Sequence, residues 1–218
     1  MNKRLSKHLD NLILRYPVLN SIEDQIIDAY LILEQCYANG GKVLICGNGG
    51  SAADAEHIVG ELMKSFKLPR IIDSEYAASL KSVDEEMGAV LADNLQGAMP
   101  AIALDGHPSL TTAYMNDCEP LLCFAQQVNG LGEPNDVIIC ISTSGNSKNI
   151  LYAGVTAKAK NMKVIGLTGR NNSKLSKIAD VCVQAPDTET FKIQELHLPI
   201  YHCLCLMLEE KFFGIGEK

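Results

Sequence analysis

The sequence predicts a three-layer α/β fold in which a doubly wound parallel sheet of five strands is flanked by helices. Short apolar segments recur along the chain, and segments with helical spacing separate them. This alternation is typical of a parallel sheet with crossover helices. Two of the apolar segments run directly into glycine-rich or hydroxyl-rich turns. Because ligands bind at the carboxyl ends of the strands in such sheets, these turns are the first candidates for a functional site.

The first part of the chain predicts two helices that precede the sheet. Apolar residues recur at helical spacing over residues 4–16 and again over about 21–39. The sequence Asn39-Gly40-Gly41 can end the second helix. The expected organisation is a single domain over 1–218, with N-terminal helices in 1–40 and an α/β core in 41–213.

The apolar runs place the five expected strands at Val43–Cys46, Ala101–Leu104, Val137–Ile141, Val164–Leu167 and Val181–Val183. The expected helices of the core cover Ser51–Ser65, Ser109–Met115, Glu119–Val128, Ser147–Lys160, Lys174–Ile178 and residues 190–213. The segment Phe66–Pro100 has the least regular pattern, and we expect one helix in it, near Glu85–Leu95. Pro199 removes a hydrogen bond inside the last helix, so a bend is expected there.

Composition and charge narrow the class of protein. The chain has 218 residues, of which 47% are hydrophobic, and a net charge of −7. The negative charge argues against nucleic acid as the main partner, and no apolar run reaches the ~20 residues that span a bilayer. The cysteines lie mostly inside apolar runs and lack the CxxC spacing of a zinc knuckle. We therefore expect reduced thiols in a cytoplasmic protein without a signal peptide.

The first candidate turn, Gly47-Asn48-Gly49-Gly50-Ser51, follows the first strand and opens a helix. Glycines allow a sharp turn and a close approach of a ligand to the backbone, and the free N–H groups of a helix N-terminus attract anions. Two alternatives remain open. The turn could connect strand and helix without a ligand, or Gly47, Gly49 and Ala52 could form the G-x-G-x-x-A pattern of a nucleotide-dependent oxidoreductase. The second alternative lacks the later strand ending in an acid that such sites carry.

The second candidate turn follows the third strand and contains four hydroxyl side chains and a glycine. It reads Ser142-Thr143-Ser144-Gly145-Asn146-Ser147. Hydroxyls and backbone amides at a helix start can hold the oxygens of a phosphate without a cation. Ser147 could also act only as a helix cap, but one cap does not account for four hydroxyls. The pattern therefore favours a phosphate site.

Two pairs of polar side chains lie at helical spacing beyond these turns. His57 and Glu61 are four residues apart and share one face of a helix. Gln194 and His202 are eight residues apart and differ by about 80° around a helix axis. Together the pairs offer two nitrogens and two oxygens, a donor set suited to tetrahedral zinc. A hydrogen-bonded histidine and an exposed glutamate would explain the same spacing without a metal. We interpret the nearby His197 as a histidine that either packs in the core or supports the ligand side chains from behind.

Four segments, ICGNGGSAADAEH, ISTSGNS, VIGLTGR and KIQELHLPIYH, occur in an order that resembles the sugar isomerase (SIS) family, and within it the phosphoheptose isomerases. The resemblance runs from the N-terminal helices to residue 213. It implies the SIS fold and an aldose–ketose isomerase. The implied reaction converts a phosphorylated sugar, expected to be sedoheptulose 7-phosphate, into D-glycero-D-manno-heptose 7-phosphate through an enediol. The resemblance also implies self-association through the N-terminal helices in residues 1–40, expected to give a homotetramer.

The resemblance assigns roles to individual residues. Glu61 is implied as the catalytic base and His202 as its acid–base partner. The implied ligands of one zinc ion per subunit are His57, Glu61, Gln194 and His202. The implied substrate contacts are Asn48, Gly49, Gly50, Ser51, Asn116, Asp117, Ser142, Thr143, Ser144, Ser147 and Gln194.

The chain departs from the family pattern in three places. Phe191 stands where heptose isomerases commonly carry an acid, and Ser65 stands where an arginine often follows the glutamate. The segment Phe66–Pro100 is longer than is usual. An alternative of another class is a non-catalytic SIS protein, a phosphosugar sensor or protein-binding regulator of the replication-initiation type. Retention of both Glu61 and His202 favours the enzyme.

Overall fold

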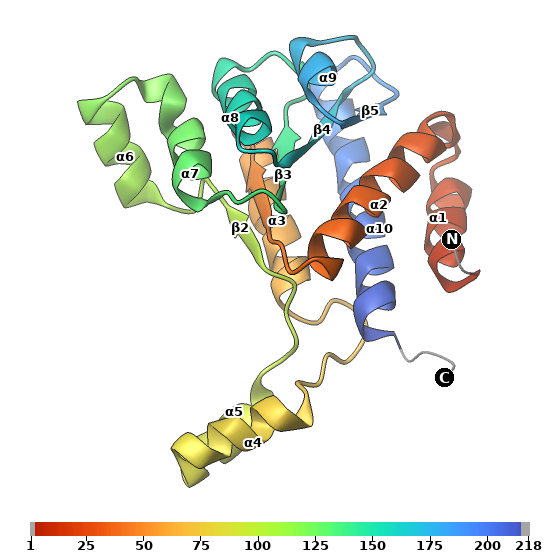
Figure 1. Cartoon of the computed structure of the whole chain (residues 1–218). Helices are drawn as coiled ribbons and strands as arrows, with labels where there is room; N and C mark the ends of the chain where they lie inside the picture. The colour runs from red at the N-terminus through yellow and green to blue at the C-terminus, as the bar shows by residue number, and fades with distance from the viewer. Residues whose placement is uncertain (1–2, 215–218) are drawn as a thin grey trace.

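The computed structural model describes residues 3–214. Five strands form one parallel sheet in the order β2-β1-β3-β4-β5 (Figure 1). These strands are β1 (Val43–Cys46), β2 (Ala101–Ala103), β3 (Val137–Ile141), β4 (Lys163–Gly169) and β5 (Val181–Ala185). The chain runs from β1 outward to β2 and returns to β3 on the other side of β1. The expected doubly wound α/β fold is confirmed, and the β1–β3 boundary is where such sheets bind ligands.

Helices cover both faces of the sheet because alternate strand side chains point to opposite faces. Ile45 belongs to one apolar core and the adjacent Leu44 to the other. The first core is completed by residues of α2 (Glu23–Ala38), α3 (Gly50–Met63) and α10 (Thr190–Phe213). The second is completed by residues of α7 (Cys123–Leu131), α8 (Lys148–Ala159) and α9 (Lys174–Ile178). The sheet is therefore the middle of three layers (Figure 1).

The N-terminal helices lie outside the sheet, as expected, but share its first core. Helix α1 (Lys3–Arg15) is followed by the 3-10 helix η1 (Pro17–Ile22). Leu5, Leu9 and Leu12 are buried on one face of α1, and this helix packs against α10. At the other end of the sheet, α6 (Pro108–Asp117) and η2 (Pro120–Leu122) separate β2 from α7, and Figure 1 shows α6 beyond α7.

The segment between α3 and β2 forms a helical hairpin, of which the sequence pattern predicted only the second helix. Its helices are α4 (Ser74–Val83) and α5 (Glu85–Asn94). Asp73 and Asp84 cap them, accepting hydrogen bonds from the N–H groups of Tyr76 and Met87 at 2.8 and 2.7 Å. Figure 1 shows the pair projecting away from the rest of the molecule. We call residues 73–94 the arm.

A buried ion pair fixes the root of the arm. The guanidinium of Arg70 lies 2.9 Å from the carboxylate of Glu209 on α10, and neither side chain is exposed by more than 1%. Glu209 also accepts hydrogen bonds from the N–H groups of residues 66–68 at 2.8–3.0 Å. Arg70 donates to the backbone oxygens of Glu61 and Leu62 at 2.9 and 2.6 Å. The root is thus tied to the carboxyl end of α3 and to α10.

The observed bounds of several elements can be compared with the predicted ones. Strand β3 and helices α9 and α10 have the predicted bounds, whereas β4 and β5 are longer than predicted. Helix α10 continues as one helix through Pro199. All eight cysteines are free, and only Cys118 is exposed. Within residues 3–214, the helices lack the combined length and hydrophobicity that a membrane crossing requires.

Candidate active site at the β1–β3 boundary

The two turns singled out in the sequence lie side by side at the carboxyl edge of the sheet. Asn48, after β1, and Asn149, in the first turn of α8, exchange a pair of hydrogen bonds. The amide of Asn48 donates to Asn149 at 3.0 Å, and the amide of Asn149 donates to Asn48 at 2.8 Å. Because these residues come from the loops after β1 and β3, the pair spans the point where the winding of the sheet reverses.

The glycines of the first turn bring α10 against the start of α3. Gly49 has a φ of +57°, a backbone conformation that glycine adopts without strain. A Cβ atom on Gly50 would lie 2.7 Å from Nε2 of Gln194. The absence of that atom lets Gln194, far away in the sequence, lie over the first turn of α3. Ser51, the next residue, is buried.

The hydroxyl-rich turn is closed by contacts of its own. The Ser142 hydroxyl donates to that of Ser147 at 3.2 Å, and the Ser144 hydroxyl accepts from the N–H of Asn146 at 3.2 Å. Gly145 has a φ of +62° and lies against Ser173, leaving no room for a side chain. Ser147 precedes α8 but its hydroxyl makes no cap hydrogen bond. The alternative in which Ser147 acts only as a helix cap is therefore wrong.

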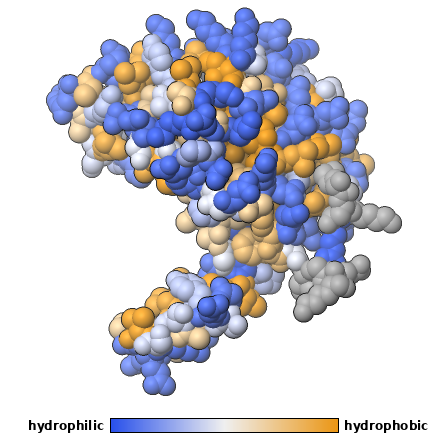
Figure 2. All heavy atoms as spheres, in the orientation of Figure 1, coloured by the Kyte–Doolittle hydropathy of each residue, from blue (hydrophilic) through white to orange (hydrophobic). Residues whose placement is uncertain are grey.

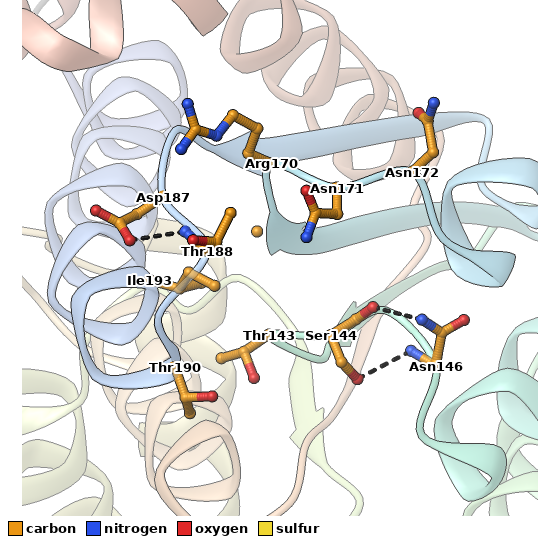
Figure 3. A pocket seen from close by; sticks show the side chains of 11 residues that line it. Thr143, Ser144, Asn146, Arg170, Asn171, Asn172, Asp187, Thr188, Thr190 and Ile193 are labelled. Atoms are coloured by element: carbon orange, nitrogen blue, oxygen red, sulfur yellow. Dashed lines mark hydrogen bonds between the residues drawn. The ribbon is translucent and has the colours of Figure 1, made fainter.

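A cavity of about 350 Å³ opens on the β4–β5 side of this turn. Figure 3 shows Thr143 and Ser144 on one side of it and Arg170 and Asn171 on the other. Asp187, after β5, accepts a hydrogen bond on its backbone oxygen from the N–H of Arg170 at 3.0 Å. The sequence analysis included the segment VIGLTGR in the family resemblance but assigned no role to Arg170. The signal available was its positive charge shortly after the fourth apolar strand segment, at the edge of the sheet where ligands bind.

The carboxylate and the imidazoles meet where α3 and α10 cross. Nε2 of His57 lies 3.2 Å from Oε1 of Glu61 and 3.4 Å from Nε2 of His202. The Glu61 side chain is only 12% exposed, and its second oxygen lies 3.3 Å from Nζ of Lys64. The ring of His202 packs against those of His57 and Phe66. Three of the four predicted ligands are thus brought together from two helices.

A second set of contacts fixes the orientation of His57. The Tyr201 hydroxyl donates to Asp54 at 3.2 Å and lies 3.0 Å from Nδ1 of His57. Since the hydroxyl has one proton, it accepts from His57, which places the imidazole proton on Nδ1. Nε2, on the other side of the ring, faces Glu61 and His202, and in the neutral imidazole it carries the lone pair. Sequence reasoning missed Asp54 and Tyr201. The signal available was that Asp54 lies three residues before His57 on the same helix face.

The nitrogen and oxygen atoms of the predicted ligands are of the kinds that bind zinc. Two of the distances between these atoms also match those expected around a zinc ion. Bonds of about 2.0–2.1 Å in a tetrahedron separate neighbouring ligand atoms by about 3.3–3.5 Å, close to the 3.2 and 3.4 Å around His57. A hydrogen-bonded Nδ1 is also typical of a zinc-ligating histidine. However, within residues 3–214 no group of three His, Cys, Asp or Glu side chains is arranged so that it could hold a metal ion.

Burial controls the charge of His202. Its desolvation, reinforced by His57, lowers the pKa of His202 below the usual histidine value, and the Glu61 carboxylate opposes this. The imidazole is therefore neutral at neutral pH and can accept a proton. Desolvation likewise raises the pKa of Asp54, against the effects of Tyr201 and His57.

His197 and the pair Asn116 and Asp117 lie away from the carboxylate and imidazoles of the site. His197 is fully buried, with Nε2 3.1 Å from the backbone oxygen of Thr168, which confirms the packing interpretation. Asn116 and Asp117 lie exposed at the end of α6, where the Asn116 amide donates to Asp117 at 2.8 Å. The contacts described for residues 3–214 do not connect this pair to Glu61 or to the hydroxyl-rich turn. Its role in substrate binding stays a prediction.

Comparison with known proteins places these features in a family. The SIS domain model matches residues 14–98 and 92–169. The phosphoheptose isomerase of Thiobacillus denitrificans is 38% identical over 189 residues, which cover 85% of this chain and 83% of the relative. The chain belongs to the phosphoheptose isomerase family of SIS-domain proteins. The Campylobacter jejuni member is 38% identical, covering 88% of this chain and 89% of the relative.

Solved structures of phosphoheptose isomerases have the same fold. The structure from Francisella tularensis aligns with a TM-score of 0.74 and 31% identity over 96% of this chain and 100% of that one. The structure from Neisseria gonorrhoeae gives 0.69 and 32%, covering 93% of this chain and 96% of that one. These relatives are named as isomerases, so they favour the enzyme over the non-catalytic regulator and the oxidoreductase.

Proposed function

We propose that this phosphoheptose isomerase family member converts sedoheptulose 7-phosphate into D-glycero-D-manno-heptose 7-phosphate. One observation carries the proposal: Glu61 of α3 and His202 of α10 both lie at His57, on the helix that starts at the glycine turn. At a rise of 1.5 Å per residue, His57 lies about 10 Å along α3 from Gly50. An anion held at the turns and an acid–base pair farther along α3 suit an extended sugar phosphate.

The chemistry requires a base at carbon and a proton carrier at oxygen. The Glu61 carboxylate takes the proton from the carbon next to the carbonyl, which leaves an enediol, and returns it to the neighbouring carbon. The neutral imidazole of His202 can take a proton from one sugar oxygen and give it to the other. The lowered pKa of His202 supports this shuttling role at neutral pH. The reaction consumes no net proton.

The phosphate is assigned to the turn between β3 and α8. Its hydroxyls are those of Ser142, Thr143, Ser144 and Ser147. The first N–H groups of α8 add the positive end of the helix dipole. The Ser147 hydroxyl accepts from Ser142 and makes no cap hydrogen bond, so its own proton is left for a ligand, which supports a role in phosphate binding. Asn48, Gly49, Gly50, Ser51 and Gln194 would border the sugar.

Zinc is part of the proposal. His57, Glu61, Gln194 and His202 would hold the ion, which as a Lewis acid would stabilise negative charge on the substrate oxygens. The contact of His57 Nδ1 with Tyr201 supports this, because a neutral ring with its proton on Nδ1 would present the lone pair of Nε2 to a metal. We also propose a cytoplasmic homo-oligomer, expected to be a tetramer. Eight free cysteines support a reducing compartment.

A panel of ketose and aldose phosphates, with products followed by NMR, tests the function. We expect turnover of sedoheptulose 7-phosphate and its loss in Glu61→Gln, with sugar-phosphate binding retained within about tenfold because the phosphate contacts are elsewhere. Turnover of only another sugar phosphate would correct the substrate. Full activity in Glu61→Gln would refute the base assignment.

A further inference from the structure

The arm exposes apolar side chains that the rest of the described chain does not cover. Helix α4 has no buried residue, and the only one in α5 is Gly88. Met87, Val90 and Leu91 are 63%, 61% and 41% exposed. Their spacing puts them on one face of α5. Figure 2 shows this projecting part of the molecule with hydrophobic residues on its surface.

Two helices of this length need a partner surface. Helices shorter than about 12–15 residues are marginal in water, and most helical stability in proteins comes from packing an apolar face. Each helix of the arm has 10 residues and a well-formed N-cap. The caps specify where the helices begin, and the exposed apolar face is what remains to be packed. The arm is therefore built as an interaction surface.

The net charge of the arm indicates what kind of surface covers its apolar face. The arm carries six acidic residues and one lysine, a net charge of −5. Two arms packed on each other would place like charges together, which is unfavourable. The partner surface should be basic with exposed apolar residues. Helix α1 has this character, with four lysine or arginine residues against one aspartate.

The outward face of α1 offers the matching side chains. Lys7 and Leu14 are two helical turns apart on that face, opposite the buried leucines. Leu14 is 79% exposed and the nearby Val18 is 50% exposed. Lys7 also lines a groove of about 550 Å³ between α1, α10 and the root of the arm. On α1 itself Arg4 is already paired with Glu210 at 3.8 Å. Elsewhere, several lysines are also in ion pairs within the chain, namely Lys42, Lys158, Lys163, Lys192 and Lys211.

We propose that the arm of one copy of this chain docks on the α1 surface of a second copy. Each copy carries one arm and one receiving surface, so two copies can exchange arms across a two-fold axis, and two such pairs would make up the expected tetramer. Reciprocal exchange doubles the buried area, which matters because a stable interface buries about 1,200–2,000 Å². The ion pair of Arg70 with Glu209 holds each arm in a fixed direction, which lowers the entropic cost of docking.

Deletion of the arm tests the proposal. Ile71 and Gln96 form a bridge across its neck, so residues 72–95 can be replaced by two glycines. Sedimentation velocity of the full chain should show an oligomer, and the deletion variant should sediment as a smaller species with its far-UV spectrum otherwise native. An unchanged oligomeric mass in the deletion variant, or a monomeric wild type, would overturn the proposal.

Two point variants guard against a folding defect in the deletion. Val90→Asp should raise the dissociation constant at least tenfold, while the matched control Val155→Asp, on α8 and 53% exposed, should leave it unchanged. Glu86→Lys and Lys7→Glu should each weaken association, because each reverses a charge on one of the two complementary surfaces. An unchanged dissociation constant in both charge variants would contradict the charge complementarity. The readout is mass, so it is independent of whether the chain isomerises sugars.

Discussion

Tyr201 on α10 joins Asp54 and His57 on α3, through hydrogen bonds of 3.2 and 3.0 Å at one hydroxyl group. The link acts on the side of His57 opposite to Glu61 and His202. The link orients the ring of His57 and favours a proton on its Nδ1. Loss of a hydrogen bond of this kind typically lowers metal affinity or activity by about 10–100-fold.

Tyr201→Phe removes the hydroxyl and keeps the ring. We expect zinc affinity and kcat to fall by about 10–100-fold, with KM for the sugar phosphate little changed because the phosphate turn is untouched. Metal competition titrations give the affinity without reference to turnover. Tyr152→Phe, on α8 and away from this link, is the matched control. Zinc affinity and kcat equal to wild type in Tyr201→Phe would show that the hydrogen bond does not position His57.

Gly145→Ala tests the hydroxyl-rich turn. The positive φ of Gly145 costs an L-residue about 1–2 kcal/mol, and the added methyl group would meet Ser173. We expect KM to rise at least tenfold, with a smaller change in kcat, because the hydroxyls move relative to the phosphate. Gly130→Ala, in α7 with open space around the new Cβ, should leave both constants unchanged. A normal KM in Gly145→Ala would argue against a phosphate site here.

His197 should make stability depend on pH. Burial lowers the pKa of His197 from 6.5 to about 4, and its hydrogen bond to Thr168 opposes this only in part. The unfolded chain binds the proton more readily, so the stability present above pH 6.5 is lost as the pH falls toward 4. At 1.36 kcal/mol per unit the full effect is about 3 kcal/mol. Denaturant unfolding at several pH values measures it.

The variant His197→Gln should flatten this dependence between pH 4 and 6.5, because its amide keeps a donor for Thr168 without titrating. The control is His107→Gln, which changes an exposed histidine before α6. If the wild type and His197→Gln lose stability in parallel as the pH falls, other groups are responsible.

Glu209→Gln should destabilise the fold. Burial alone would raise the pKa of Glu209, but the N–H groups of residues 66–68 and the Arg70 guanidinium hold it below the usual value. Removing one partner of a buried pair costs about 3–5 kcal/mol, since the other charge is left uncompensated. The neighbouring Glu210→Gln, whose ion pairs are more exposed, should cost less than about 1 kcal/mol. Equal melting temperatures for the two variants would contradict this ranking.

The parts of the fold predicted from sequence were those in which local pattern and tertiary packing agree. Strand β3 is apolar throughout and buried throughout, so its bounds could be predicted. Helix α4 was missed because none of its residues is buried, so its apolar residues follow no packing pattern. Its sequence signal was the cap at Asp73, which needs no packing partner.

The same distinction holds for the site. The spacing of His57 and Glu61 is local, so the sequence predicted their shared face. The contact of Tyr201 with Asp54 joins residues 147 positions apart, and that of Gln194 with Gly50 depends on how two helices cross. The zinc set and the substrate contacts stay predictions, which the Tyr201→Phe and Gly145→Ala variants test.

The bridge between Ile71 and Gln96 has one more consequence. The chain leaves and re-enters the domain at nearly the same point, so the length of the segment between these residues is independent of the geometry of the sheet. If arms dock between copies as proposed, relatives that differ in this segment would form separate assemblies in one cell while retaining the same chemistry.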